Sequence, residues 1–258
     1  MTLCMDLKIC KTNVSYIEEA VVPMQKQNEN LNQNEQQKLG TYMGYKFETV
    51  CTLNKPWEAS SRTEIETREG NIVDNTPQYA SVVRYRIGEV RLILGGEVDC
   101  VWDYKPEPPE SPLSHYVELK TSKSQKSPKD RSIFERHKLL KFWAQSFLLG
   151  VPKVIVGFRS DSGLLQSIRT FETQKIPGIV RQPSGYSPWN ANIAISFAEG
   201  VMKWLRMNIP KGDAVWRLQF RGGEGVEVYK LPETELCFLT KEFMEWRKSQ
   251  NPLKEQRG

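Results

Sequence analysis

Two short stretches place charged side chains inside apolar runs. In YVELKTS, residues 116–122, Glu118 and Lys120 stand two positions apart, and in GGEVDC, residues 95–100, Glu97 and Asp99 have the same spacing. Alternate residues of a β-strand point to one face, so each pair is expected to project from one side of its strand. If the two strands are neighbours, three carboxylates and one ammonium converge on a small volume.

Such a cluster repels itself and loses hydration unless a cation is present, because like charges in a partly buried site cannot all stay ionised. Oxygen ligands favour hard divalent cations, and one or two Mg²⁺ ions, with Mn²⁺ as an alternative, would balance the charge. Two such ions support in-line displacement at phosphorus. Lys120 could orient or deprotonate the attacking water, or neutralise charge on the phosphate.

The apolar spacing around these residues predicts a mixed α/β (α+β) fold with a twisted mixed sheet flanked by helices. We expect one catalytic-type domain over residues 1–250, with a polar linker at 21–38 and a frayed tail at 251–258. Helices are predicted over 34–53, 131–150 and 192–208, and strands over 2–11, 79–102 in two parts joined near Gly88, 116–122, 153–159 and 164–171. In the last helix, the predicted packing stripe is Ile193, Phe197, Val201, Trp204 and Leu205.

Composition sets limits on the class of protein. The chain of 258 residues has 36 basic and 31 acidic side chains, a net charge of +5 that is compatible with a polyanionic partner without demanding one. Its five cysteines are odd in number and lack CxxC spacing, so neither a zinc site nor a disulfide framework is indicated. No apolar run is long enough to cross a bilayer, and we expect a soluble intracellular protein without a membrane partner.

The order Asp99, then Glu118-x-Lys120, is similar to the signature of PD-(D/E)XK nucleases. The longer series YMGYKFE, GEVDC, YVELKTSK, RHKLLKFWAQSFL and GVPKVIVGFR resembles, in order and spacing, the motifs of the DXO family of decapping exoribonucleases. This resemblance covers about residues 39–206. It also implies a PD-(D/E)XK-type fold.

The resemblance implies a role for each matching residue. Glu48 in GYKFE would be a metal ligand on a helix, and the other metal ligands would be Glu97, Asp99, Glu118 and the main-chain carbonyl of Leu119. Glu97, Asp99, Glu118 and Lys120 would form the catalytic group. Glu97, Lys120 and Gln145 would contact RNA. Lys138, Lys141 and Gln145 also share one face of the predicted helix, which could guide a phosphate backbone if it borders the metal site.

The activity implied by the resemblance is removal of incomplete or non-canonical 5′ caps, including nicotinamide-dinucleotide caps, followed by 5′-to-3′ degradation of the RNA. A nuclear location, with the cytoplasm as an alternative, and a larger 5′-to-3′ exoribonuclease as partner are also implied. We expect the family's upstream segment, with its arginine motif, to be absent. Two other readings remain open: a PD-(D/E)XK-type DNA nuclease, and a non-catalytic partner of an exoribonuclease.

Overall fold

The computed structural model describes residues 2–9, 14–19, 35–181, 187–223, 225–232 and 239–250. It divides into two compact units, a larger one over residues 33–199 and a smaller one formed by residues 1–32 and 200–258. The expected single domain over 1–250 therefore stays a prediction. Of the expected linker, residues 21–34 lie outside the described residues, whereas residues 35–38 belong to a helix; the expected tail at 251–258 also lies outside them.

The described elements follow one another along the chain in a mixed α+β order, which confirms the predicted fold class. The strands are β1 (Thr2–Ile9), β2 (Ser15–Glu19), β3 (Ala80–Ile87), β4 (Val90–Glu97), β5 (Cys100–Val101), β6 (Tyr116–Lys123), β7 (Lys153–Arg159), β8 (Leu165–Glu172), β9 (Trp216–Arg221) and β10 (Gly225–Lys230). The helices are α2 (Glu35–Cys51), α3 (Arg62–Glu66), α4 (Pro128–Ile133), α5 (Leu139–Leu149), α6 (Ile176–Ile179), α7 (Ala191–Asn208) and α8 (Lys241–Ser249). Short 3₁₀ turns are η1 (Trp57–Ala59), η2 (Arg68–Gly70), η3 (Pro112–His115) and η5 (Thr173–Lys175), and η4 (Phe134–Lys138) is a π-helical turn.

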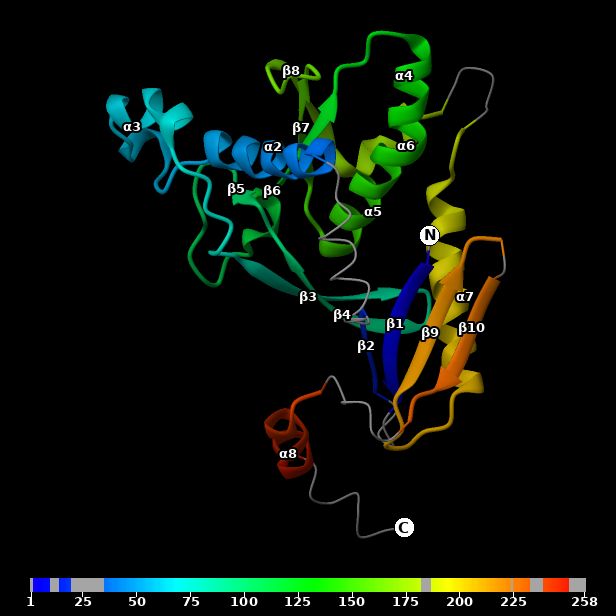
Figure 1. Cartoon of the computed structure of the whole chain (residues 1–258). Coiled ribbons are helices and arrows are strands. Elements are labelled where there is room, and N and C mark those ends of the chain that lie inside the picture. The colour runs from blue at the N-terminus through cyan, green and yellow to red at the C-terminus, as the bar shows by residue number, and fades with distance from the viewer. Residues whose placement is uncertain are drawn as a thin grey trace. The chain divides into compact units, whose positions relative to one another are not determined.

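The main sheet of the larger unit has the strand order β5-β6-β7-β8 (Figure 1). β6 and β7 run parallel, with Leu119 opposite Ile155, while β5–β6 and β7–β8 are antiparallel. The strands predicted over 153–159 and 164–171 are confirmed, and they pair as a hairpin. The condition that the strand of Glu97 be a neighbour of the strand of Glu118 is not met among the described strands: β4 pairs with β3 in a separate sheet, and the chain passes through β5 to reach β6.

Helices cover both faces of β6 and β7. On one face, Phe47 of α2 packs against Val117 and Leu119 of β6. On the other face, Val154 and Val156 of β7 form a core cluster with side chains of α5, including Leu139 and Trp143. Because β7 is covered on both sides, its residues 154–158 include no polar side chain, as expected of a buried strand, whereas β6 carries polar side chains at 118 and 120–123.

The segment predicted as one helix over 131–150 consists of α4, the π-helical turn η4 and α5. The wider turn lets Phe134 reach the core, where its ring lies 5.3 Å from that of Phe158, centroid to centroid. π-helical turns of this kind often occur at functional sites. α5 ends at Gly150 with φ of 78°, a left-handed conformation that glycine adopts readily and that confirms the predicted stop.

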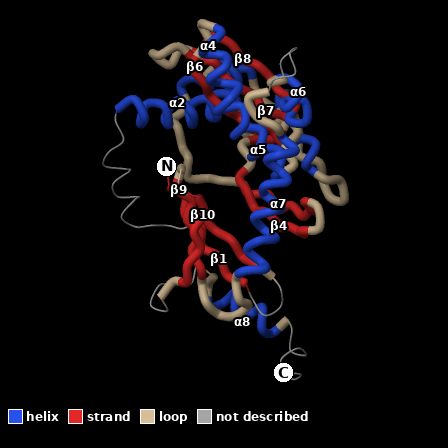
Figure 2. The backbone as a smooth tube through the Cα atoms, turned by 90° about the vertical axis from the view of Figure 1, so that its right-hand side faces the viewer, coloured by secondary structure: helices blue, strands red, loops and turns tan. Residues whose placement is uncertain are grey.

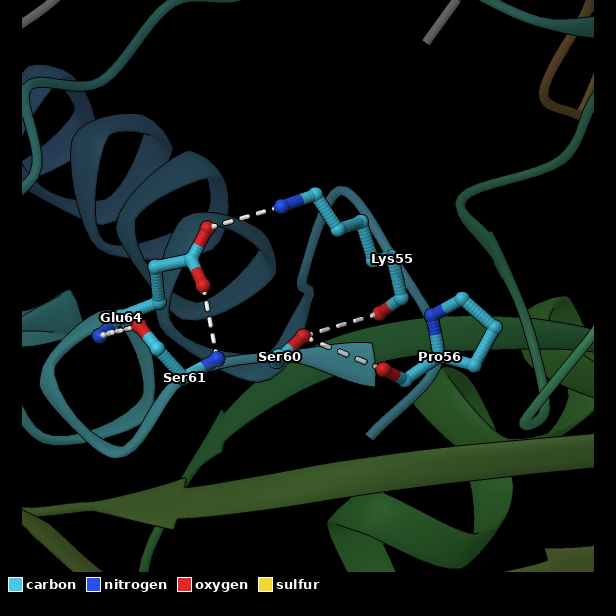
Figure 3. Close-up of polar contacts among 5 residues, drawn as sticks. All are labelled: Lys55, Pro56, Ser60, Ser61 and Glu64. Carbon is cyan, nitrogen blue, oxygen red and sulfur yellow. Dashed lines mark hydrogen bonds and ion pairs between the residues drawn. The ribbon is translucent and has the colours of Figure 1, made fainter. Parts of the chain in front are cut away.

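Residues 54–78, for which the sequence pattern predicted neither a helix nor a strand, contain η1, α3 and η2. α3 begins with a capping box, in which the Ser61 hydroxyl accepts from the Glu64 N–H and the Glu64 carboxylate accepts from the Ser61 N–H (Figure 3). Lys55 donates to the same carboxylate at 3.4 Å, and the Ser60 hydroxyl donates to the carbonyls of Lys55 and Pro56. Local polar contacts, which a hydrophobic pattern does not reveal, therefore hold this exposed segment.

The smaller unit contains an antiparallel sheet with the order β10-β9-β1-β2 and the C-terminal part of α7 (Figure 2). Leu7 of β1, Leu218 of β9 and Leu205 of α7 lie in its core. None of the described helices combines the length and the apolar character that a bilayer crossing requires.

The predicted packing stripe of α7 is only partly correct. Val201 and Leu205 pack inward, but Ile193 and Phe197 are 69% and 66% exposed, and Trp204 is also exposed. The helix instead turns Ala194 and Ile195 toward the core of the larger unit. Because α7 is apolar on more than one face, spacing alone could not identify the buried side.

Gly157 of β7 allows α2 to approach the sheet. A Cβ placed there would lie 2.5 Å from Phe47 Cε2 and 3.0 Å from a Leu165 methyl group, so Gly157→Ala is expected to destabilise the protein by about 1–3 kcal/mol through overpacking. Gly44→Ala in the middle of α2 is the matched control, since a Cβ there meets nothing within 4 Å. It should stabilise the protein by about 0.5–1 kcal/mol through helix propensity. Chemical denaturation of both variants checks the two signs; equal effects would contradict this packing.

Candidate functional site

Glu118 is the most deeply buried acid among the described residues, with 0% of its surface exposed. Its side chain forms an ion pair through Oε1 with the Lys120 ammonium, which lies on the same side of β6 two residues further on. Oε2 has no hydrogen-bond partner among the described residues. A buried carboxylate with an unused oxygen is costly, which indicates that a ligand belongs there.

Asp99 lies beside Glu118, but not on the strand that the sequence predicted. It stands in the two-residue link between β4 and β5, and its Oδ2 accepts a hydrogen bond of 2.6 Å from the main-chain N–H of Leu119. Since β5 pairs with the beginning of β6, this link fixes the Asp99 carboxylate against the Glu118–Lys120 segment. Asp99 and Glu97 therefore reach the site from a bend and a strand end, and not from one strand face.

Glu48 approaches from α2, one residue after the buried Phe47. Its pKa is raised to about 7, first by burial and then by the nearby carboxylates of Asp99, Glu97 and Glu118, while the Lys120 ammonium opposes the shift. Glu97 is exposed at the end of β4. All four predicted carboxylates and the predicted lysine therefore lie within electrostatic reach of one another.

The same crowding raises the pKa of the other buried acids. Burial raises the pKa of Glu118, and the Asp99 charge adds to it; burial also raises the pKa of Asp99, against the opposing effects of Lys120 and the Leu119 N–H. Burial would lower the pKa of Lys120, but the carboxylates, led by Glu118, outweigh it and raise the pKa. Lys120 is thus held as an ammonium, suited to donating hydrogen bonds and balancing negative charge.

A divalent cation fits the chemistry of these donors. Their oxygens suit a hard ion, their mutual repulsion would be relieved by one, and Glu118 Oε2 is free to bind it. Within the residues that the structure describes, no three acidic, histidine or cysteine side chains are already gathered as a metal-binding group. The carboxylates would have to move closer together around an ion, and Glu118 would give up part of its contact with Lys120 in order to bind that ion.

Two cysteines next to this cluster do not change the preference for a hard ion. Cys51 ends α2 and Cys100 follows Asp99, and both pack against Phe47 and Leu119. Burial raises the pKa of Cys51 to about 11 and, with the Asp99 charge, that of Cys100 to about 12. Both stay neutral thiols near neutral pH, so they are poor ligands for soft metals.

The other predicted residues lie on the helical segment that follows β6, and their roles are untested. Gln145 and Lys141 are exposed on α5, while Lys138 belongs to the π-helical turn before it. The roles of Gln145 in RNA contact and of the Leu119 carbonyl in metal binding stay predictions. The sequence analysis placed Asp99 within a strand and missed that it lies in a short link between β4 and β5. The acidic residue between the β-prone residues Val98 and Cys100 was the one sign of an interruption there.

Comparison with known proteins gives a consistent picture. Residues 4–244 match the family model described as RAI1 like PD-(D/E)XK nuclease. A protein of Emericella nidulans named "Decapping nuclease RAI1" is 49% identical over 213 residues, which are 82% of this chain and 58% of that protein. The chain therefore spans little more than half the length of this relative.

Two solved structures are similar over 96% of this chain and 69% of theirs, each at 32% identity. One is Candida albicans Rai1 in complex with pU5-Mn²⁺, with a TM-score of 0.86. The other is Scheffersomyces stipitis Rai1 in complex with (3′-NADP)⁺ and calcium ion, with a TM-score of 0.85.

The raised pKa of Glu48 makes stability depend on pH. A carboxyl group whose pKa is higher in the folded protein than its ordinary value of 4.5 favours folding when protonated, so the metal-free protein should lose stability as pH rises from about 5 to about 8. Allowing for solvent screening, we expect a loss on the order of 1–2 kcal/mol, which Glu48→Gln should largely remove. Thermal unfolding with a chelator across this pH range measures it.

Glu58→Gln, at an exposed glutamate of η1, is the control and should keep the wild-type pH profile. Added Mg²⁺ or Mn²⁺ should stabilise the wild type more at pH 8 than at pH 5.5, because protons compete with the ion for the carboxylates. A flat pH profile together with no effect of either ion would show that these acids do not form a metal site.

Proposed function

Because the chain belongs to the RAI1-like PD-(D/E)XK nucleases, within the DXO family, we propose that it is a divalent-metal-dependent hydrolase of RNA 5′ ends. It removes incomplete or non-canonical caps, including nicotinamide-dinucleotide caps, and degrades the exposed RNA in the 5′-to-3′ direction. The observation that carries the proposal is the buried Glu118 beside Lys120, with Asp99 fixed on the same segment by its bond to Leu119.

The ligands of the relatives support the substrate class. The Candida albicans structure holds pU5 and Mn²⁺, a short 5′-phosphorylated RNA with a divalent ion, and the Scheffersomyces stipitis structure holds a nicotinamide dinucleotide. A site that accepts both kinds of ligand would bind a nucleotide at a 5′ end and hydrolyse the phosphodiester or pyrophosphate bond next to it. Carried over to this chain, they favour RNA over DNA and a dinucleotide among the accepted caps.

We assign the cation to the four carboxylates of Glu48, Glu97, Asp99 and Glu118, with the Leu119 carbonyl as a further ligand. Mg²⁺ is the proposed ion, with two ions in the working site and Mn²⁺ as a substitute. When bound, the ions supply charge neutralisation at the reacting phosphate and a more acidic water.

Lys120 has a separate task. With Glu118 engaged by a cation, the Lys120 ammonium can turn to the reacting phosphate or to the attacking water, and its raised pKa keeps it charged. Asp99 cannot move freely, since its Oδ2 is bound to the Leu119 N–H, so it fixes one wall of the site. Glu97, Lys120 and Gln145 are the proposed RNA contacts around this wall.

Glu118→Gln and Asp99→Asn are each expected to reduce hydrolysis by at least about 10²–10³-fold, because a pre-organised electrostatic group of this kind contributes at least that much. RNA binding should persist in both variants. Glu110→Gln, at an exposed position in the loop before η3, is the matched control and should keep wild-type rates. Single-turnover assays with 5′-phosphorylated RNA give the measurement. Full Mg²⁺-dependent activity in both site variants would refute the assignment.

A panel of 5′ ends tests substrate preference. Purified protein with Mg²⁺ is incubated with triphosphate, unmethylated-cap, nicotinamide-dinucleotide-cap and monophosphate RNAs, and the released products are identified by mass. We expect release of cap-derived products from the first three and mononucleotides from the last. Matched DNA of the same sequence should compete poorly; preferred cleavage of DNA would instead favour the DNA nuclease reading.

We further propose, from the family resemblance, a nuclear location and association with a larger 5′-to-3′ exoribonuclease. Pull-down with the Glu118→Gln protein separates partner binding from catalysis. An exoribonuclease that binds the folded surface of this protein should still be captured when hydrolysis is lost. Association without any intrinsic hydrolysis by the wild type would support the non-catalytic reading. Imaging of a fluorescent fusion tests the location.

A further inference from the structure

Three carboxylates of the site are chain neighbours of a single apolar cluster. Glu48 follows Phe47 on α2, Asp99 precedes Cys100 of β5, and Glu118 stands between two members of the cluster on β6. This cluster, the α2–β6 seam, consists of the mutually packed side chains of Phe47, Cys51, Cys100, Val117, Leu119 and Ile155. The packing of the seam therefore determines how far apart the main-chain segments that carry the carboxylates lie.

Two cysteines are the small members of the seam, one on each side of it. Cys51 comes one turn after Phe47, so both side chains lie on the same face of α2. Cys100 lies opposite Val117 in the β5–β6 pairing and shares its face of the sheet. Both thiols are free, and the charges of Cys51 and Glu48 act on the Cys100 thiol and help to raise its pKa. Cys100 therefore lies within electrostatic reach of the last turn of α2.

The seam leaves little room for larger side chains. At the Phe47 end, α2 approaches the sheet so closely that a Cβ added at Gly157 would lie 2.5 Å from the Phe47 ring. Close-packed interiors respond to added volume by moving side chains and main chain. A bulkier residue at position 51 or 100 would move the last turn of α2 away from β5. The separation of Glu48 from Asp99 would then increase.

The separation of the carboxylates matters because divalent ions differ in size and tolerance. Mg²⁺ demands octahedral oxygen ligands at about 2.0–2.1 Å, whereas Ca²⁺ accepts six to eight ligands at about 2.3–2.6 Å in flexible geometry. The carboxylates of this site come from a helix, a link and a strand, so packing between these elements decides how closely they can approach one ion. A wider site loses affinity for a small ion before it loses affinity for a large one.

We propose that Cys51 and Cys100 are positioning residues that set the ion preference of the site. Their small side chains keep α2 close enough to β5 and β6 for the carboxylates to close around an ion of the size of Mg²⁺. The thiols themselves do not bind the ion; they act through Glu48 and Asp99. The inference deepens the proposed function and rests on it for the identity of the ion.

The test enlarges one side of the seam at a time. Cys51→Leu adds volume on α2, and Cys100→Val adds volume on β5 with a side chain that suits a strand. Cys51→Ser and Cys100→Ser keep the size of the thiol and are the matched controls. Ile176→Val removes one carbon from the core cluster that α5 forms with β7, and it serves as a control for lost stability alone.

Ion binding is measured on the full chain without RNA. Electron paramagnetic resonance of free Mn²⁺ gives the Mn²⁺ affinity, and displacement by Mg²⁺ or Ca²⁺ gives the affinities of the two competitors. The ratio of Mg²⁺ affinity to Ca²⁺ affinity should fall about tenfold in Cys51→Leu and Cys100→Val, because the rigid coordination of Mg²⁺ tolerates widening poorly. The serine variants and Ile176→Val should keep the wild-type ratio, whatever their melting temperatures.

Three results would overturn the inference. One is an unchanged ratio in both enlarged variants. Another is an equal loss of affinity for all three ions, because a merely structural role predicts that loss without a change in preference. The third is Mn²⁺ binding that is the same in the wild type and in Glu118→Gln, because the ion would then be bound elsewhere. Circular dichroism checks folding; if Cys51→Leu does not fold, Cys100→Val and the smaller change Cys51→Val decide.

Failure of this inference is distinguishable from failure of the proposed function. A shifted ion preference in the enlarged variants, with no hydrolysis of any capped or phosphorylated RNA by the wild type, would leave the positioning role standing and remove the proposed activity. An unchanged ion preference, with wild-type hydrolysis that Glu118→Gln abolishes, would do the reverse.

Discussion

Burial of the Glu118 charge is the constraint on which the larger unit depends. Glu118 is a fully enclosed carboxylate whose one ion-pair partner among the described residues is Lys120, through one of its two oxygens, so it is expensive to keep ionised. Glu48 and Asp99 add negative charge instead of relieving it. Such an arrangement lowers stability in the free protein and raises affinity for a cation, so the same charges that oppose folding provide the site with its chemistry.

The fold withstands this repulsion because β6 is anchored on both faces. Phe47 packs on the Leu119 side of the sheet, allowed by the absence of a side chain at Gly157, and the α5 cluster packs on the Val154 and Val156 side. The Leu119 N–H binds Asp99 and thereby ties the β4–β5 link to the middle of β6. Well-packed apolar contacts around a strained polar centre hold the carboxylates in place when no ion holds them.

Much of the site could be predicted from sequence because its residues lie in strongly patterned segments. The strand predicted over 153–159 has the observed bounds of β7, and the helix predicted over 34–53 contains α2, which presents Glu48. The position of Asp99 could not be predicted in the same way, since a two-residue link has no periodicity and its geometry depends on a hydrogen bond to a distant main-chain group. The buried face of α7 was predicted wrongly for a related reason: apolar residues occur on more than one side of this helix, and their spacing does not show which side another element will cover.

The charges along β6 and its surroundings change sign over a short distance. The carboxylates gather about Glu118, Lys120 stands between, and the strand ends at Lys123 opposite Arg159. An RNA chain has equally spaced phosphates of one sign, so it cannot be attracted to both ends in the same way. For a polyanion, the acidic end of this strand is repulsive until a cation is bound, so occupancy by a divalent ion would decide whether a phosphate can approach Glu118 and Lys120.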